Sequence, residues 1–205
     1  MTVTPADVRS AACLAVATLR RARDADWSVR AGALEWDCWE TAEHLIDDLF
    51  SYAVQLASER TDTDVPFRYT QETPGSPCNA VRAERATGVD GLLLALESAA
   101  GLLHAVTATK PAEARAHHVF GVSDPEGFAA MGVVETLVHT YDLASGLGID
   151  GWEPPADLCA RTLHRLFPDA PVGPPPWPTL LWCTGRGELP GLPRPATWRW
   201  YGEPR

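Results

Sequence analysis

The chain has 205 residues, a formal net charge of −10 and five scattered cysteines. This length is typical of one domain with a small appendage, and no C-x-x-C pair indicates a zinc finger. The acidic balance argues against nucleic acid or an anionic membrane as a partner, because those interfaces depend on Lys and Arg. No signal peptide is visible and no stretch reaches ~20 apolar residues, so we expect a cytoplasmic protein that binds a small molecule and could form a homodimer.

Two helices are predicted in the first third of the chain. Residues 4–23 open with Thr-Pro-Ala-Asp, a helix start, and continue with apolar residues at helical spacing. Residues 37–58 open with Asp37 and Glu40, which resemble a capping box. His44 falls nearly opposite the apolar stripe of this second helix, on a line of polar residues. Periodicity alone therefore favours an exposed histidine, although a metal site open to solvent would also place a ligand there.

The middle of the chain is predicted to hold a long connection and a third helix. Residues 60–87 form the connection, with a strand-like stretch at 65–72 and a short helix around 78–86. The third helix should cover residues 89–107, where leucines recur on one broad stripe.

The most informative stretch is a helix over residues 127–148, apolar on nearly every face and therefore interior. Asp-Pro-Glu precedes it as a start signal, and Gly148 is a good C-terminal cap. Glu135 and His139 stand four residues apart, with Asp142 on the same side. Because buried carboxylates are costly unless they are compensated, this cluster requires either a metal ion or an internal hydrogen-bond network.

The last part of the chain, after Gly151, differs from the rest in composition and is rich in Pro and Trp. A short amphipathic helix is predicted at 154–168, followed by an extended, polyproline-like connector at 171–178. Residues 180–189 are predicted to form a brief helix or turn. The alternation of aromatic and polar residues at 196–203 favours one short strand.

These elements predict an all-α fold, a four-helix bundle with long connections and a small C-terminal extension. The bundle should occupy residues 1–150. The extension, rich in Pro and Trp, should occupy residues 151–205 and pack on the bundle as a cap.

Two motifs resemble a known family. EWDCWETAEHL places Trp36 eight residues before His44, and GVVETLVHTYDLASGLG carries Glu135 and His139. Together they resemble the DinB-like superfamily and, more narrowly, the N-terminal metal-binding domain of mycothiol-dependent maleylpyruvate isomerases. The resemblance covers about residues 5–150, and the segments LLWCTGRGELPG and WRW resemble the tails of actinobacterial relatives. It implies a DinB-like bundle that holds a divalent ion with His44, Glu135 and His139 as ligands.

This ligand set points to a catalytic type of metal site. Two imidazoles and one carboxylate suit Zn²⁺ best, and also Ni²⁺, Fe²⁺ or Mn²⁺, and three protein ligands leave positions open for water or substrate. The resemblance implies mycothiol or another small thiol as cosubstrate, activated by the metal for isomerisation or S-transfer. The isomerase carries an additional C-terminal domain, whereas only about 55 residues follow Gly148 here.

Four further residues are candidates for supporting roles. Asp142 could accept a hydrogen bond from a ligand imidazole, or serve only helix packing. His118, in a loop, could act as a general acid or base. Arg82 could contact an anion of the thiol, although a solvated surface arginine is the simpler interpretation. Trp36 should lie near the mouth of the site because of its spacing from His44, although tryptophans also seal bundle ends.

Three functional hypotheses follow. The first is a metal-dependent transferase or isomerase that uses a small thiol. The second is a metal-dependent hydrolase, cyclase or isomerase of secondary metabolism that uses no thiol. The third is a binding or interaction protein in which Glu135, His139 and Asp142 form only an internal network.

Overall fold

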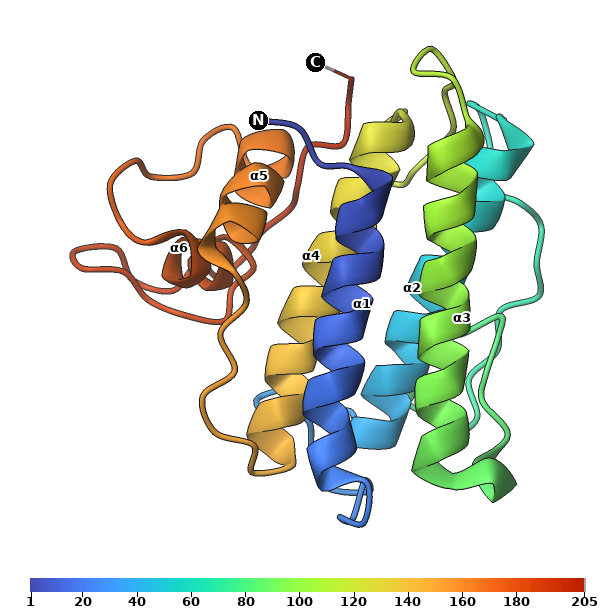
Figure 1. Ribbon diagram of the computed structural model, residues 1–205, viewed down its shortest axis with the longest axis vertical. Coiled ribbons are helices and arrows are strands. Elements are labelled where there is room, and N and C mark those ends of the chain that lie inside the picture. The colour runs from blue at the N-terminus through green and yellow to red at the C-terminus, as the bar shows by residue number, and fades with distance from the viewer. Residues whose placement is uncertain (205) are drawn as a thin grey trace.

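The computed structural model describes residues 1–204 and is helical, with no strand among these residues (Figure 1). The prediction of an all-α protein is therefore confirmed. The α-helices are α1 (Pro5–Leu19), α2 (Cys38–Ser58), α3 (Gly88–Thr109), α4 (Pro125–Gly146), α5 (Ala156–Leu166) and α6 (Pro176–Cys183). Two 3₁₀ turns, η1 (Arg20–Ala22) and η2 (Arg85–Thr87), follow α1 and precede α3.

The four long helices lie side by side, and α5 and α6 pack beside α4 (Figure 1). Helices α1 and α4 run in one direction, and α2 and α3 run in the other. Each of α1 and α2 packs against both α3 and α4. Because α2 and α3 are parallel neighbours, the chain must return along the full length of the helices between them. Residues 59–87 make this return, which explains the long connection predicted from the sequence.

The helix starts follow the capping signals in the sequence. The Asp37 carboxylate accepts a hydrogen bond from the Glu40 amide at 2.7 Å, and the Asp37 amide donates to the Glu40 carboxylate at 3.1 Å. This reciprocal pair is the predicted capping box of α2. Asp124 caps α4 by accepting from the Gly127 amide at 2.7 Å. Gly148 follows the end of α4 with φ +67°, a conformation that glycine adopts without steric cost.

Helix α4 is the interior helix that its sequence predicts. Nearly all of its residues are buried, including Glu135, His139 and Asp142. Its last turn also touches the loop before α2: a Cβ at Gly146 would collide with the Arg30 carbonyl oxygen and approach the Cys38 Sγ to 2.8 Å. Glycine at this position therefore allows the loop that carries Trp36 to lie directly on α4.

Several local predictions were wrong. Residues 65–72 and 196–203 form no strand; the first stretch makes a single bridge, between Thr70 and Asn79, because its largely exposed residues face no partner strand. The helix expected around 78–86 is reduced to the turn η2 at its end. Part of the connector at 171–178 is helical, because prolines are tolerated in the first turn of a helix and Pro176 begins α6.

The segment Arg85–Thr109, which includes α3, is long and apolar enough to cross a membrane by length and composition alone. This finding corrects the expectation that no segment is apolar enough over the length of a membrane span. One side of α3 nevertheless lies in the core, where its buried leucines are Leu92, Leu93, Leu96 and Leu103. A core helix of this kind meets the same length and composition criteria.

The C-terminal segment is joined to the four long helices by apolar contacts and by ion pairs, two of which come from α5. Apolar side chains of α5 and α6 belong to the same core as those of α1–α4. Arg161 contacts Asp7 at 2.6 Å, and the buried Arg165 contacts Asp124 at 2.8 Å and also donates to the Gly202 carbonyl. A domain boundary near residue 150 stays a prediction.

The Asp7 contact makes the stability of the protein depend on pH. Burial raises the pKa of Asp7, but hydrogen bonds from Thr4 and Arg161 outweigh it and hold that pKa below the usual 3.8. The stabilisation is therefore complete above the unfolded pKa and is lost as the pH falls through the folded pKa. We predict that Asp7→Asn lowers the free energy of unfolding at pH 7 by roughly 1–3 kcal/mol, and that the difference disappears in acid.

Urea denaturation from pH 7 down to pH 3 measures this effect. Asp157→Asn is the matched control, because Asp157 pairs with the same Arg161 but is exposed to solvent. We expect this control to change stability much less than Asp7→Asn, because solvent screens an exposed ion pair. Equal effects of the two substitutions would contradict the prediction.

Candidate metal centre

Helices α2 and α4 each contribute an i, i+4 pair of potential ligands to one site. On α2, His44 Nε2 lies 3.3 Å from Asp48 Oδ2; on α4, His139 Nε2 lies 3.3 Å from Glu135 Oε2. The two pairs face each other, with the imidazole centroids of His44 and His139 5.4 Å apart. One donor atom from each of His44, Asp48 and His139 lies within 4.8 Å of the other two.

Glu135 belongs to the same site and is held from two sides. Its Oε2 lies near His139, and its Oε1 accepts a hydrogen bond from the Tyr52 hydroxyl at 3.3 Å. The three predicted ligands His44, Glu135 and His139 are thus brought together, and all three line one cavity. Asp48, rather than Glu135, completes the tightest group of donor atoms.

Asp142 connects His139 to the C-terminal segment. Its Oδ2 lies 3.1 Å from His139 Nδ1, as expected of a residue that orients an imidazole. Arg186, in the loop after α6, donates from Nε to both Asp142 oxygens at 3.1 Å and from a terminal nitrogen to Oδ2 at 2.7 Å. The guanidinium also donates to the Thr184 carbonyl, which fixes its position. The Asp142 carboxylate is therefore hydrogen-bonded both to the His139 imidazole and to the Arg186 guanidinium.

The site opens into a cavity of about 490 Å³. Its walls come from the loop before α2, from α2 and α4, and from the C-terminal segment. Trp36 packs edge-on against His44, with ring centroids 4.8 Å apart, and so lies at the site as its spacing predicted. The C-terminal segment contributes Gly185, Arg186, Arg194 and Trp198 to the walls.

The two histidines differ in their electrostatic surroundings. Burial lowers the pKa of His44 to about 4, and the neighbouring His139 adds to this effect, so the His44 imidazole is neutral. Burial also disfavours a charged His139, but its hydrogen bonds to Asp142 and Glu135 outweigh burial and raise its pKa to about 9. A proton on His139 thus offsets part of the negative charge of its two carboxylate neighbours.

In the part of the chain that the structure describes, the Asp48 carboxylate has no protonated imidazole or guanidinium beside it to offset a negative charge. Its Oδ2 is inaccessible to solvent and makes no hydrogen bond within residues 1–204, although His44 Nε2 lies 3.3 Å away. Burial, with a further contribution from Glu135, raises the pKa of Asp48 well above its usual value. The site holds three carboxylates, those of Asp48, Glu135 and Asp142, against two cations, Arg186 and a protonated His139. Because an imidazole must be neutral to ligate a metal, a divalent ion that replaces the His139 proton would balance the three carboxylates together with Arg186.

A divalent ion fits these residues. It would supply positive charge beside the unpartnered Asp48 oxygen, and the neutral His44 already offers a lone pair. Imidazole and carboxylate ligands suit Zn²⁺, Fe²⁺, Mn²⁺ and Ni²⁺. The open cavity leaves room for another molecule at the site.

Two sequence-predicted residues lie outside this cavity. His118 is buried on the far side of Tyr52, with the two ring centroids 5.8 Å apart, and its Nδ1 accepts from the Phe120 amide. Burial lowers the pKa of His118 to about 4. Arg82 is used by the connection before α3, where it donates to Thr70 and to the Asn79 carbonyl. Neither residue lines the metal cavity.

Sequence reasoning missed three residues of the site. Asp48 lies on the same polar line of α2 as His44, and its spacing from His44 repeats the spacing of Glu135 and His139. Tyr52 follows Asp48 by four residues on the same helix, so the i, i+4 series on α2 was a usable signal. Arg186 lies in a loop 44 residues from its partner, and no local pattern connects it to Asp142.

No family model, curated protein or solved structure matches this chain. The resemblance to the DinB-like superfamily therefore rests on the two motifs, and membership of that family stays a prediction.

The pairing of Asp142 with Arg186 gives a stability prediction. Removing one member of a buried ion pair leaves the other charge unpaired, which typically costs 3–5 kcal/mol, whereas removing both members costs much less. We expect Arg186→Met to lower the free energy of unfolding by roughly 3 kcal/mol. Arg186→Met combined with Asp142→Leu should recover most of that loss. Urea denaturation in the presence of a chelator measures both, and a double variant less stable than Arg186→Met would refute the assignment.

Proposed function

We propose that this protein is a divalent-metal-dependent enzyme of the DinB and maleylpyruvate isomerase type, with the corresponding four-helix bundle. Zn²⁺ is the favoured ion. The proposed reaction is S-transfer or isomerisation that uses a low-molecular-weight thiol such as mycothiol. The observation that carries the proposal is the convergence of His44 and Asp48 from α2 with Glu135 and His139 from α4, around a buried carboxylate oxygen that has no partner.

In this proposal His44, Glu135 and His139 hold the ion, and Asp48 is a fourth candidate ligand. A bound divalent ion would supply Lewis acidity and would lower the pKa of a thiol at the site. Asp142 accepts from His139 Nδ1 and fixes which imidazole nitrogen faces the site, while Arg186 holds Asp142 in place.

The other residues bind substrate and limit the access of water. Trp36 packs against His44 and closes one side of the cavity. Arg194 also lines the cavity, and its guanidinium makes no ion pair within residues 1–204. It is therefore available for a carboxylate of the thiol or of its acceptor.

Metal content tests the proposal directly. We predict about one equivalent of divalent metal, measured by elemental analysis of protein purified without a metal-binding tag. His139→Ala should abolish the bound metal, and Asp48→Asn should weaken binding by roughly ten- to a hundredfold. His164→Ala is the matched control, because His164 is exposed on α5, and it should retain the metal. Full metal occupancy in His139→Ala would overturn the ligand assignment.

The thiol requirement is tested separately. With a reactive electrophile as acceptor, turnover by the metal-loaded protein should appear on addition of mycothiol and should be smaller with bacillithiol or glutathione. Rates are compared with and without each thiol by following thiol consumption. Turnover that does not depend on any thiol would instead favour a thiol-independent hydrolase, cyclase or isomerase.

One observation favours a non-catalytic alternative. Glu135, His139, Asp142 and Arg186 already form a connected hydrogen-bond network, and a neutral, protonated Asp48 would complete its charge balance. In that case the protein would be a binding or interaction protein. Absence of metal from the protein as purified, together with no uptake on dialysis against Zn²⁺, would support this alternative.

A further inference from the structure

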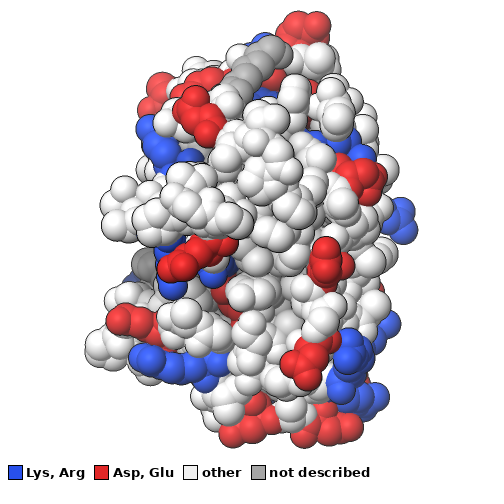
Figure 2. All heavy atoms as spheres, turned by 90° about the vertical axis from the view of Figure 1, so that its left-hand side faces the viewer, with Lys and Arg blue, Asp and Glu red and all other residues white. Residues whose placement is uncertain are grey.

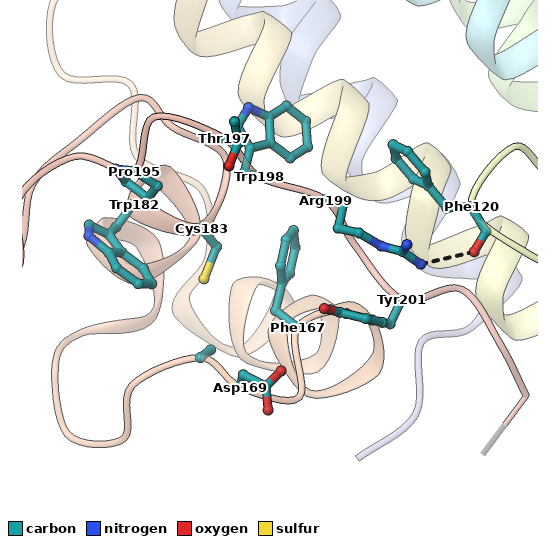
Figure 3. Close-up of a pocket in the computed structure, with 11 residues that line it drawn as sticks. Phe120, Phe167, Asp169, Trp182, Cys183, Pro195, Thr197, Trp198, Arg199 and Tyr201 are labelled. Carbon is teal, nitrogen blue, oxygen red and sulfur yellow. Dashed lines mark hydrogen bonds between the residues drawn. The ribbon is translucent and has the colours of Figure 1, made fainter.

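A second cavity, of about 530 Å³, lies between α5, α6 and the C-terminal tail. Figure 3 shows the side chains that line it, and five of them are aromatic. These are Phe120, Phe167, Trp182, Trp198 and Tyr201. Figure 2 faces the side of the molecule that carries α5 and α6, and most of that surface is uncharged.

Phe167 belongs to the hydrophobic core and Phe120 and Trp182 pack against it, but four of the five rings keep part of their surface in the cavity. Trp198 is 40% exposed, and Phe120, Trp182 and Tyr201 are only half-buried. Leaving several large rings in contact with water forgoes the free energy that their burial would supply. Exposed apolar surface gathered in one concave site is typical of a ligand-binding pocket.

The charged groups of this cavity select the kind of ligand. Arg199 is already engaged: its guanidinium lies 4.7 Å from the Tyr201 ring centroid, 5.3 Å from that of Phe120, and 3.7 Å from Glu203. Asp169 is exposed to solvent at another edge of the cavity, and its carboxylate makes no hydrogen bond or ion pair within residues 1–204 (Figure 3). The available charge is therefore negative.

Cys183 adds no covalent chemistry to this cavity. Burial raises the pKa of its thiol to about 11, so the thiol is protonated and a poor nucleophile. The cavity thus offers aromatic faces, which attract cations, and one free carboxylate.

We propose that this cavity binds a small molecule that combines an aromatic ring with a protonated amine. The ring stacks among the five aromatic side chains, and the ammonium group faces Asp169. This inference goes beyond the proposed metal-dependent function and stands whether or not the first site holds an ion. Because Trp198 lines both cavities, the bound amine would contact a wall of the metal cavity.

Three matched probes test the proposal by isothermal titration calorimetry of the full-length protein at pH 7. They are 1-naphthylmethylamine, 1-naphthylmethanol and 1-naphthoate, which share a ring system and differ in charge. We expect saturable binding of the amine with a Kd below ~1 mM, roughly fivefold tighter than the alcohol, with the carboxylate weakest. Absence of saturable amine binding, or tightest binding of the carboxylate, would overturn the proposal.

Two pairs of variants locate the binding site. Ala170 lines the cavity, whereas Val172 is fully exposed two residues away. Ala170→Trp should weaken all probes at least tenfold and Val172→Trp should leave them unchanged. Asp169→Asn should reduce amine affinity to that of the alcohol, whereas Asp150→Asn, at an exposed position outside the cavity, should have no effect. Equal effects within either pair would refute the assignment.

The same titration on His139→Ala separates this site from the metal centre. The amine should bind this variant as it binds the wild type, because His139 does not line the aromatic cavity. Loss of metal with retained amine binding would support the aromatic cavity as the binding site of the amine, whatever the role of the metal centre. Loss of amine binding in His139→Ala would place the amine at the metal centre and overturn the proposal.

Discussion

The structure depends on the compensation of carboxylates buried between α2 and α4. Glu135 and Asp142 are buried on α4, and Asp48 is half-buried on α2 with one inaccessible oxygen, so each needs a positive group or a hydrogen-bond donor. Arg186 and His139 supply this for Asp142, and His139 and Tyr52 supply it for Glu135. Asp48 is left with an oxygen that has no hydrogen-bond partner among the described residues, and a cation beside that oxygen would compensate its charge.

The need for Arg186 gives the C-terminal segment a role in the site as well as in the packing. The segment reaches the four long helices through α5, and its loop after α6 then places Arg186 on Asp142. The same segment supplies walls to both cavities through Trp198. The C-terminal segment therefore provides walls of both cavities in addition to its packing against the four long helices.

The sequence predicted features that depend on neighbours along the chain. Caps at Asp37 and Asp124 located the starts of α2 and α4, and the apolar faces of α4 showed that Glu135 and His139 are buried. Features that depend on distant contacts were missed. The polar line through His44 and Asp48 indicated solvent, because the Trp36 loop and the C-terminal segment that cover it lie elsewhere in the chain. Alternation at 196–203 predicted a strand, but its aromatic residues pack around a cavity and pair with no strand.

The distance along the chain between Asp142 and Arg186 also bears on how the protein is made. These partners are separated by 44 residues, so Asp142 is added to the chain well before Arg186. At ~5–20 residues per second, the nascent chain spends several seconds with all of α4 synthesised and its buried carboxylate without its arginine. During that interval α4 gains little by burying Asp142. The final closure of the helices around the site should therefore be a late event in folding, completed only after the segment that carries Arg186 has been made.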